Sequence, residues 1–328
     1  MNRLLALGAT ATALGITAES LARRLTLVDA SPDVTPHAEA EWKIMRLAEL
    51  RAQRRLPSTV LLGASVLDAD IDPDVVERSA PHLRPVFNAC LGGSETMSLA
   101  SWWRILRHEV RPDRAAIEVH PLMVHGETSL MAASVNEALS RLEPRSCPSR
   151  SSRVAATTLR REDFKRGRVT QALHARSNGT GLRTDRNLSN GHLHRFRDVP
   201  FEEGIRTLPR DWYEAIGIDP RPNPDVQQYV DFALAVKADV GDVMLVVSPL
   251  ALHSTASTAG GYDSYVQYGD TIVAECPGLG FPVLDLRPHF TSFADFADPF
   301  HLRSWAITRA SQLLAGALTD EFGSHHSS

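Results

Sequence analysis

Thr59-Val-Leu-Leu-Gly-Ala-Ser65 is an apolar run without polar alternation, and it ends in three small residues. A strand with one wet face alternates polar and apolar side chains, whereas a parallel strand covered by helices on both faces is apolar throughout. The run therefore predicts a central strand of a parallel sheet, with Ser65 just beyond its carboxyl end.

Four further apolar runs have the same character and lie at 85–90, 115–119, 243–248 and 282–286. Segments with apolar residues at helical spacing fall between and around the strands, at 36–55, 98–110, 226–238, 262–276 and 302–319. Strands that alternate with helices indicate βαβ units. We therefore expect an α/β fold with a doubly wound, mostly parallel sheet of five strands.

The segment at about 143–223 interrupts this rhythm. It holds loop-like and turn-like clusters of Ser, Asn and Gly. Between Arg145 and Arg197 it carries 13 Lys and Arg residues against three acids. We expect one α/β domain at 26–328 with a basic, loop-rich insertion, which either is a solvated loop or contacts an anionic polymer or membrane surface.

The first 25 residues allow two interpretations. Arg3 precedes a mildly apolar run at 4–18, which is long enough for the h-region of a signal peptide but diluted by Thr and Gly. Residues 1–25 are therefore either a signal peptide or membrane anchor, or an ordinary leader. Export toward the cell envelope and a cytoplasmic location both stay open.

Composition excludes several classes of protein. The 328 residues are 43% hydrophobic and 23% charged with a net charge of -4, which favours a globular protein without an obligate nucleic-acid partner. Cys90, Cys147 and Cys276 lack metal-binding spacing, and His192 and His194 lack further ligands. We expect buried thiols, no metal and no cofactor, with one disulfide left open if the protein is exported.

Polar residues and glycines cluster where the predicted strands end, and ligands bind at that edge of a parallel sheet. Ser65 follows the first strand, and Asn88-Ala-Cys-Leu-Gly-Gly93 follows the second. Asp298-Pro-Phe-His301 precedes the last helix, and its spacing can place both side chains on one turn. A serine becomes a nucleophile when a histidine takes its proton and a carboxylate orients that histidine.

The order of these segments resembles the SGNH (GDSL-like) hydrolase superfamily. Gly63-Ala-Ser65-Val-Leu-Asp68 is similar to its Gly-Asp-Ser block, with Ala64 in place of the acid, and Asn88 to Gly93 is similar to its second block. Asp298-Pro-Phe-His301 is similar to its last block. The resemblance implies a three-layer α/β/α, flavodoxin-like architecture.

The resemblance also implies roles for these residues. Ser65 is the expected nucleophile, His301 the base and Asp298 its orienting carboxylate. The backbone N–H groups of Ser65 and Gly93 are expected to hold the oxyanion. Asn88 and Gly92 support them.

The third block of the superfamily, Gly-x-Asn-Asp, is absent. The chain has Ile117-Glu-Val-His-Pro-Leu-Met-Val-His125, with no asparagine to donate to the oxyanion. Loss of one such donor costs about a hundredfold in rate. His120 is the nearest substitute donor, or else it merely caps the strand or faces solvent. Glu118 is either a functional acid or a carboxylate satisfied by structural partners.

These features predict a serine esterase or acyltransferase for O-acyl, acetyl-like groups on a carbohydrate or envelope polymer. The layout also resembles SGNH-like proteins of bacterial cell-envelope clusters, which implies a membrane or envelope partner. The alternative is an impaired SGNH-like domain that binds glycan or a membrane partner. A nucleotide-binding Rossmann module is disfavoured, because no Gly-x-Gly-x-x-Gly follows the first strand. Trp102, Trp103 and Trp305 are expected to pack helices against the sheet, and the alternative is an aromatic platform for a sugar.

Overall fold

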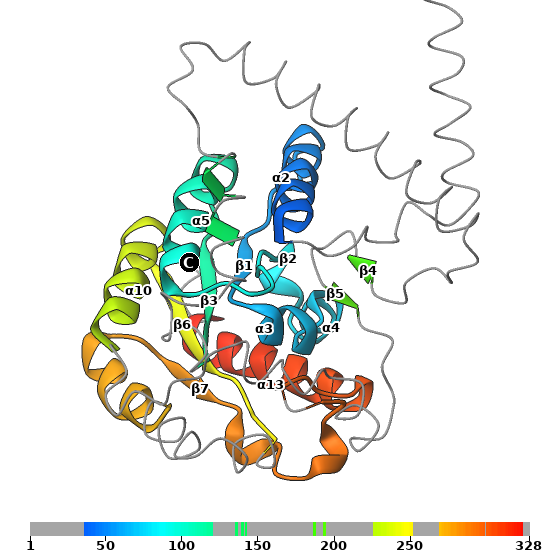
Figure 1. Ribbon diagram of the computed structural model, residues 1–328, viewed down its shortest axis with the longest axis vertical. Coiled ribbons are helices and arrows are strands. Elements are labelled where there is room, and N and C mark those ends of the chain that lie inside the picture. The colour runs from blue at the N-terminus through cyan, green and yellow to red at the C-terminus, as the bar shows by residue number, and fades with distance from the viewer. Residues whose placement is uncertain are drawn as a thin grey trace, which may run out of the picture.

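Five parallel strands form the central sheet, in the spatial order β2-β1-β3-β6-β7 (Figure 1). Their bounds are β1 Thr59–Leu62, β2 Val86–Asn88, β3 Arg114–Val119, β6 Asp242–Val247 and β7 Val283–Asp285. Numbered along the chain within this sheet, the order is 2-1-3-4-5, a doubly wound arrangement that changes direction between its first and third strands. All neighbouring pairs are parallel, so the predicted five-stranded α/β sheet is confirmed.

The computed structural model describes residues 36–120, 135–136, 139–140, 142, 186–187, 193–194, 226–251, 269–298 and 300–323. The predicted leader at 1–25 lies outside these ranges, as does most of the predicted insertion at 143–223. Within the insertion, β4 (Arg186–Asn187) and β5 (Leu193–His194) are described and pair antiparallel. In the described part of the chain, no helix has the length and apolar character needed to cross a membrane.

Helices flank and follow the strands. The α-helices are α2 Pro36–Ala52, α3 Ser65–Asp70, α4 Pro73–Ser79, α5 Thr96–Glu109, α10 Val226–Val240 and α13 Ser304–Phe322. The short 3-10 turns are η1 Pro81–Leu83, η3 Cys276–Leu279, η4 Arg287–His289 and η5 Phe293–Asp295. Four predicted helices are confirmed within a few residues, and the described part of the fifth, 269–275, is helical.

Alternate strand residues supply two hydrophobic clusters, one on each face of the sheet. Val60 and Leu62 of β1 belong to the cluster that includes side chains of α2, α5 and α10. Leu61, between them, belongs to the cluster that includes side chains of α3, α4 and α13. In Figure 1, α5 and α10 lie on one side of the strands and α13 on the other. Burial on both faces explains why Val60, Leu61 and Leu62 are all apolar.

Trp102 and Trp103 of α5 pack as the sequence predicts, whereas Trp305 of α13 does not. Trp102 and Trp103 are buried, and their indole N–H groups donate to Ala89 O (2.6 Å) and to the Asp239 carboxylate (2.9 Å). Trp305 on α13 is 51% exposed, so the packing prediction is wrong there. Trp305 lies outside the face of α13 that carries the buried residues Ala306, Ala310 and Leu314.

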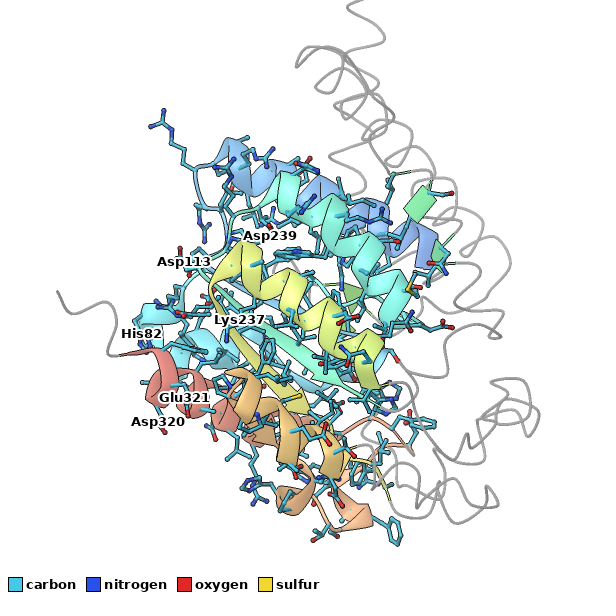
Figure 2. The ribbon with its side chains drawn as sticks, turned by 90° about the vertical axis from the view of Figure 1, so that its left-hand side faces the viewer. His82, Asp113, Lys237, Asp239, Asp320 and Glu321 are labelled. Carbon is cyan, nitrogen blue, oxygen red and sulfur yellow. The ribbon has the colours of Figure 1, made fainter. Side chains whose placement is uncertain are left out.

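Parallel strands bring their carboxyl ends to one edge of the sheet. Figure 2 shows His82, Asp113 and Asp239 gathered at the opposite, amino edge, since each precedes a strand of the sheet. The segments that follow β1, β2 and β3 therefore meet at the other edge. That carboxyl edge carries the residues that the sequence analysis predicted to form the functional site.

Candidate active site

Ser65 stands at the turn from β1 into α3. It is the first residue of the helix, and Ala64 before it is extended, with φ -95° and ψ -158°. Ser65 is half-buried, whereas Val66 and Leu67 behind it are buried. The turn thus leaves the serine as the accessible residue at the start of an otherwise buried helix.

Asp298 and His301 form a buried, tightly held pair. Both Asp298 carboxylate oxygens lie 2.9 Å from His301 Nδ1, and the two side chains are almost inaccessible to solvent. Asp298 Oδ1 also accepts the N–H groups of Phe300 (2.9 Å) and His301 (3.0 Å), which fixes the carboxylate on its own turn. Donation from Nδ1–H to this carboxylate makes Nε2 the basic nitrogen of a neutral imidazole. The predicted Asp–His pair is therefore formed.

The Asp–His turn is attached to the helix that begins at Ser65. Leu302 N–H donates to the buried Asp70 carboxylate at the end of α3 (2.9 Å). Ala297 N–H donates to His301 O (2.8 Å), which closes the turn. Among the described residues, the Ser65 hydroxyl makes no hydrogen bond, so the serine–histidine contact is not formed in this structure. Such contacts often tighten only when substrate binds.

The Gly92–Gly93 turn lies beside the serine. A Cβ placed on Gly92 would sit 3.9 Å from Ser65 Cβ. Ser94 N–H bonds to Leu91 O (3.2 Å) across the turn, and Gly93 has φ 75°, a conformation that favours glycine. Gly92 is thus brought close to Ser65, and Gly93 is its neighbour on the same turn.

Asn88 supports both segments from the core. The wholly buried side chain donates from Nδ2 to Asp68 O of α3 (3.1 Å) and accepts Cys90 N–H at Oδ1 (3.1 Å). One amide thus links α3 to the loop after β2. These contacts fit the supporting role that the resemblance implied.

Glu118, near the end of β3, is a carboxylate satisfied by partners around the serine. It accepts the N–H of Ala64, the residue before α3, and Ser248 Oγ lies 3.3 Å from its Oε1. Burial raises the pKa of Glu118 to about 7, against the opposing effect of these hydrogen bonds. A Cβ on Gly63 would overlap this carboxylate and approach Glu118 Cβ to 2.6 Å, so the residue at 63 has to be glycine.

His120 is buried rather than solvent-facing. Its ring meets Phe300 edge-on at a centroid distance of 6.1 Å, and Phe300 meets His301 in the same way at 6.5 Å. One aromatic ring thus separates the two histidines. The positions around Leu122, where the superfamily has its asparagine, lie outside the described residues.

A buried group of charges behind the site was missed in the sequence analysis. Glu39 and Lys43 of α2 and Asp68 of α3 are all closed to solvent. Lys43 Nζ lies 3.1 Å from Glu39 Oε1 and 2.9 Å from Asp68 Oδ1. Glu39 Oε2 accepts Gly92 N–H (3.0 Å), and Lys43 Nζ donates to Cys90 O. We call these three side chains the buried ion cluster.

Two opposing effects act on the charges of the buried ion cluster. Burial disfavours the Lys43 ammonium, but the carboxylates of Asp68 and Glu39 outweigh it and raise the pKa of Lys43 above its ordinary value. Burial also raises the pKa of the Asp68 carboxyl, with Lys43 opposing the rise. Lys43 is therefore an ammonium at neutral pH despite its burial.

Among the described residues, no group of three or more His, Cys, Asp or Glu side chains is arranged to hold a metal ion. Cys90 and Cys276 are buried free thiols, as predicted, and burial raises the pKa of both. Cys147 and His192 lie outside the described residues.

No protein-family model matches this chain, and no curated protein matches it either.

Proposed function

We propose that this chain is a serine esterase or O-acyltransferase of the SGNH type, with Ser65, His301 and Asp298 as its catalytic triad. The observation that carries the proposal is the buried Asp298–His301 pair, attached through Leu302 to the helix that starts at Ser65. The parallel sheet and its doubly wound order support the further proposal of a three-layer SGNH architecture.

The reaction would begin at the Ser65 hydroxyl. His301 Nε2 takes the Oγ proton while Oγ bonds to the acyl carbon, and the carbonyl electron pair moves onto oxygen. The N–H groups of Ser65 and Gly93 hold that oxyanion. On collapse the carbon–oxygen bond to the alcohol breaks, and His301 returns the proton to the leaving oxygen. Water or a sugar hydroxyl then releases the acyl group by the same steps in reverse.

The substrate class we propose is an O-acyl, acetyl-like group on a carbohydrate or envelope polymer. Its support is the layout that resembles the cell-envelope branch of the superfamily, with a helical leader and a long basic insertion. A membrane or envelope partner, and a location facing the envelope, belong to the same proposal. The step after acylation, transfer to water or to a sugar, depends on which acceptor reaches the acyl-serine.

A second candidate function is a non-catalytic domain that binds glycan or a membrane partner. Two observations favour it. The chain lacks the third-block asparagine. The Gly92 N–H beside Ser65 already bonds to Glu39, so it cannot serve as an extra oxyanion donor in this structure.

The deciding experiment is hydrolysis of p-nitrophenyl acetate by the wild type, Ser65→Ala and the control Ser101→Ala on α5. We expect Ser65→Ala to lose at least about a thousandfold in kcat, because the residual rate of triad variants comes from binding and oxyanion contacts alone. Ser101→Ala should match the wild type. Equal rates for the wild type and Ser65→Ala contradict the proposal. Absence of fluorophosphonate labelling at Ser65 as well would favour the binding domain.

A further inference from the structure

The buried ion cluster joins three segments that are far apart in the sequence. Glu39 and Lys43 lie one turn apart on α2, Asp68 lies on the nucleophile helix α3, and Cys90 and Gly92 belong to the loop after β2. Every member of the cluster is closed to solvent. A single ammonium thus contacts both segments to which the proposed oxyanion donors, Ser65 and Gly93, belong.

Stability alone is a poor explanation for such a cluster. Removing charged groups from water costs several kcal/mol for each ion, and apolar side chains of similar volume often stabilise a fold as well or better. The cluster also sits within an otherwise hydrophobic packing of α2, where Ala40 and Leu47 belong to the core. Charged side chains, unlike apolar ones, can form directional hydrogen bonds to particular backbone groups.

The backbone groups that Lys43 and Glu39 bind belong to two consecutive peptides. Lys43 holds the carbonyl of the Cys90–Leu91 peptide, and Glu39 holds the N–H of the Leu91–Gly92 peptide. The next peptide along the chain carries Gly93 N–H, the proposed oxyanion donor. Two adjacent glycines would otherwise leave this turn many conformations, since glycine is the least restricted residue.

Resting on the proposed esterase function, we propose that Glu39 and Lys43 are positioning residues that fix the Gly92–Gly93 turn against the nucleophile helix. They touch neither substrate nor reacting atoms. Lys43 sets the spacing between α3 and the loop through Asp68 and Cys90, and Glu39 sets the orientation of the turn through Gly92. A misplacement of about 1 Å at a reacting group costs about a hundredfold in rate, so this role should appear in kcat.

Lys43→Met is the obvious variant, but it leaves Glu39 and Asp68 buried without a cation and is expected to fold poorly. Two substitutions at Glu39 make the cleaner test. Glu39→Gln can keep an acceptor oxygen for Gly92 N–H, but its NH2 group then faces the Lys43 ammonium, whereas Glu39→Ala removes both contacts. Glu49→Ala is the matched control, because Glu49 lies on the same helix in a part-exposed pair with Arg46.

The measurements are kcat and KM for p-nitrophenyl acetate, with kcat expressed per Ser65 that a fluorophosphonate probe can titrate. That normalisation removes molecules that have merely unfolded. We expect Glu39→Ala to lose about 10- to 100-fold in kcat with KM within about threefold, and Glu39→Gln to lose less in kcat than Glu39→Ala. Glu49→Ala should match the wild type.

The outcomes separate the two proposals. If the wild type is active and Ser65→Ala is not, but Glu39→Ala keeps the wild-type kcat per titrated site, the positioning role is overturned while the esterase stands. A wild type with no Ser65-dependent activity and no labelling overturns both.

Discussion

Replacing Glu118 by glutamine should remove a source of pH-dependent stability. The carboxyl is wholly buried, and burial raises its pKa from 4.5 to about 7. The unfolded chain loses this proton near the ordinary value, whereas the folded chain keeps it until about pH 7. Between those values the folded state binds more protons than the unfolded state, so the wild type becomes less stable as the pH rises.

The size of the effect follows from the two pKa values. Their difference, 7 minus 4.5, is 2.5. At about 1.4 kcal/mol for each pH step of one, the ionisation of Glu118 lowers the free energy of unfolding by about 3 kcal/mol between pH 4.5 and 8. The side-chain amide of the Glu118→Gln variant carries no charge at any pH. The stability of this variant relative to the wild type should therefore rise by that amount over the same interval.

The assay is urea unfolding of both proteins at pH 4.5, 5.5, 6.5 and 8, followed by the fluorescence of the buried Trp102 and Trp103. Titrations that the two proteins share cancel in the difference between their unfolding free energies. Glu49→Gln on the surface of α2 controls for the loss of one carboxylate. A difference between Glu118→Gln and the wild type that stays flat to within about 0.5 kcal/mol from pH 4.5 to 8 would refute the reasoning.

Further predictions concern the triad and the tryptophans. Asp298→Asn should lower kcat by about 10⁴-fold with KM little changed, because an amide cannot hold the His301 tautomer. Steady-state kinetics on an activated ester measures this change. An unchanged kcat would exclude Asp298 from the proposed triad. Trp102→Ala should cost about 3–5 kcal/mol in the free energy of unfolding, because it empties a buried site. Trp305→Ala should cost less than about 0.5 kcal/mol, because the ring is half-exposed. Equal losses for the two variants in urea titrations would contradict the burial argument.

Most of the sheet could be predicted from local sequence, because burial on both faces produces an uninterrupted apolar run. The short helices α3 and α4 could not be separated from a loop by periodicity, since each is only six or seven residues long. A capping signal at Asp72-Pro73 was nevertheless present. Asp72 accepts Asp74 N–H, and Pro73 occupies the first helical turn.

One part of the candidate site could likewise be predicted from local sequence, whereas another part depends on contacts between distant segments. The Asp298–His301 pair was predictable because both residues lie on one turn, where spacing alone brings them together. The buried ion cluster was not, because Lys43 meets Asp68 across 25 residues and Glu39 meets Gly92 across 53. The sequence did carry one signal, a charged pair at i and i+4 among the apolar residues of α2. Charged residues conflict with a position that faces the core.

The close approach of Glu118 to Gly63 has a consequence for the natural variation of related sequences. The two positions lie on adjacent strands and share one volume, in which the glycine leaves room for the carboxylate. The overlap includes Glu118 Cβ at 2.6 Å, which every residue except glycine carries, so shortening residue 118 does not make room for a side chain at 63. Among homologues with this backbone, residue 63 should therefore stay glycine even where the acid at 118 has been lost.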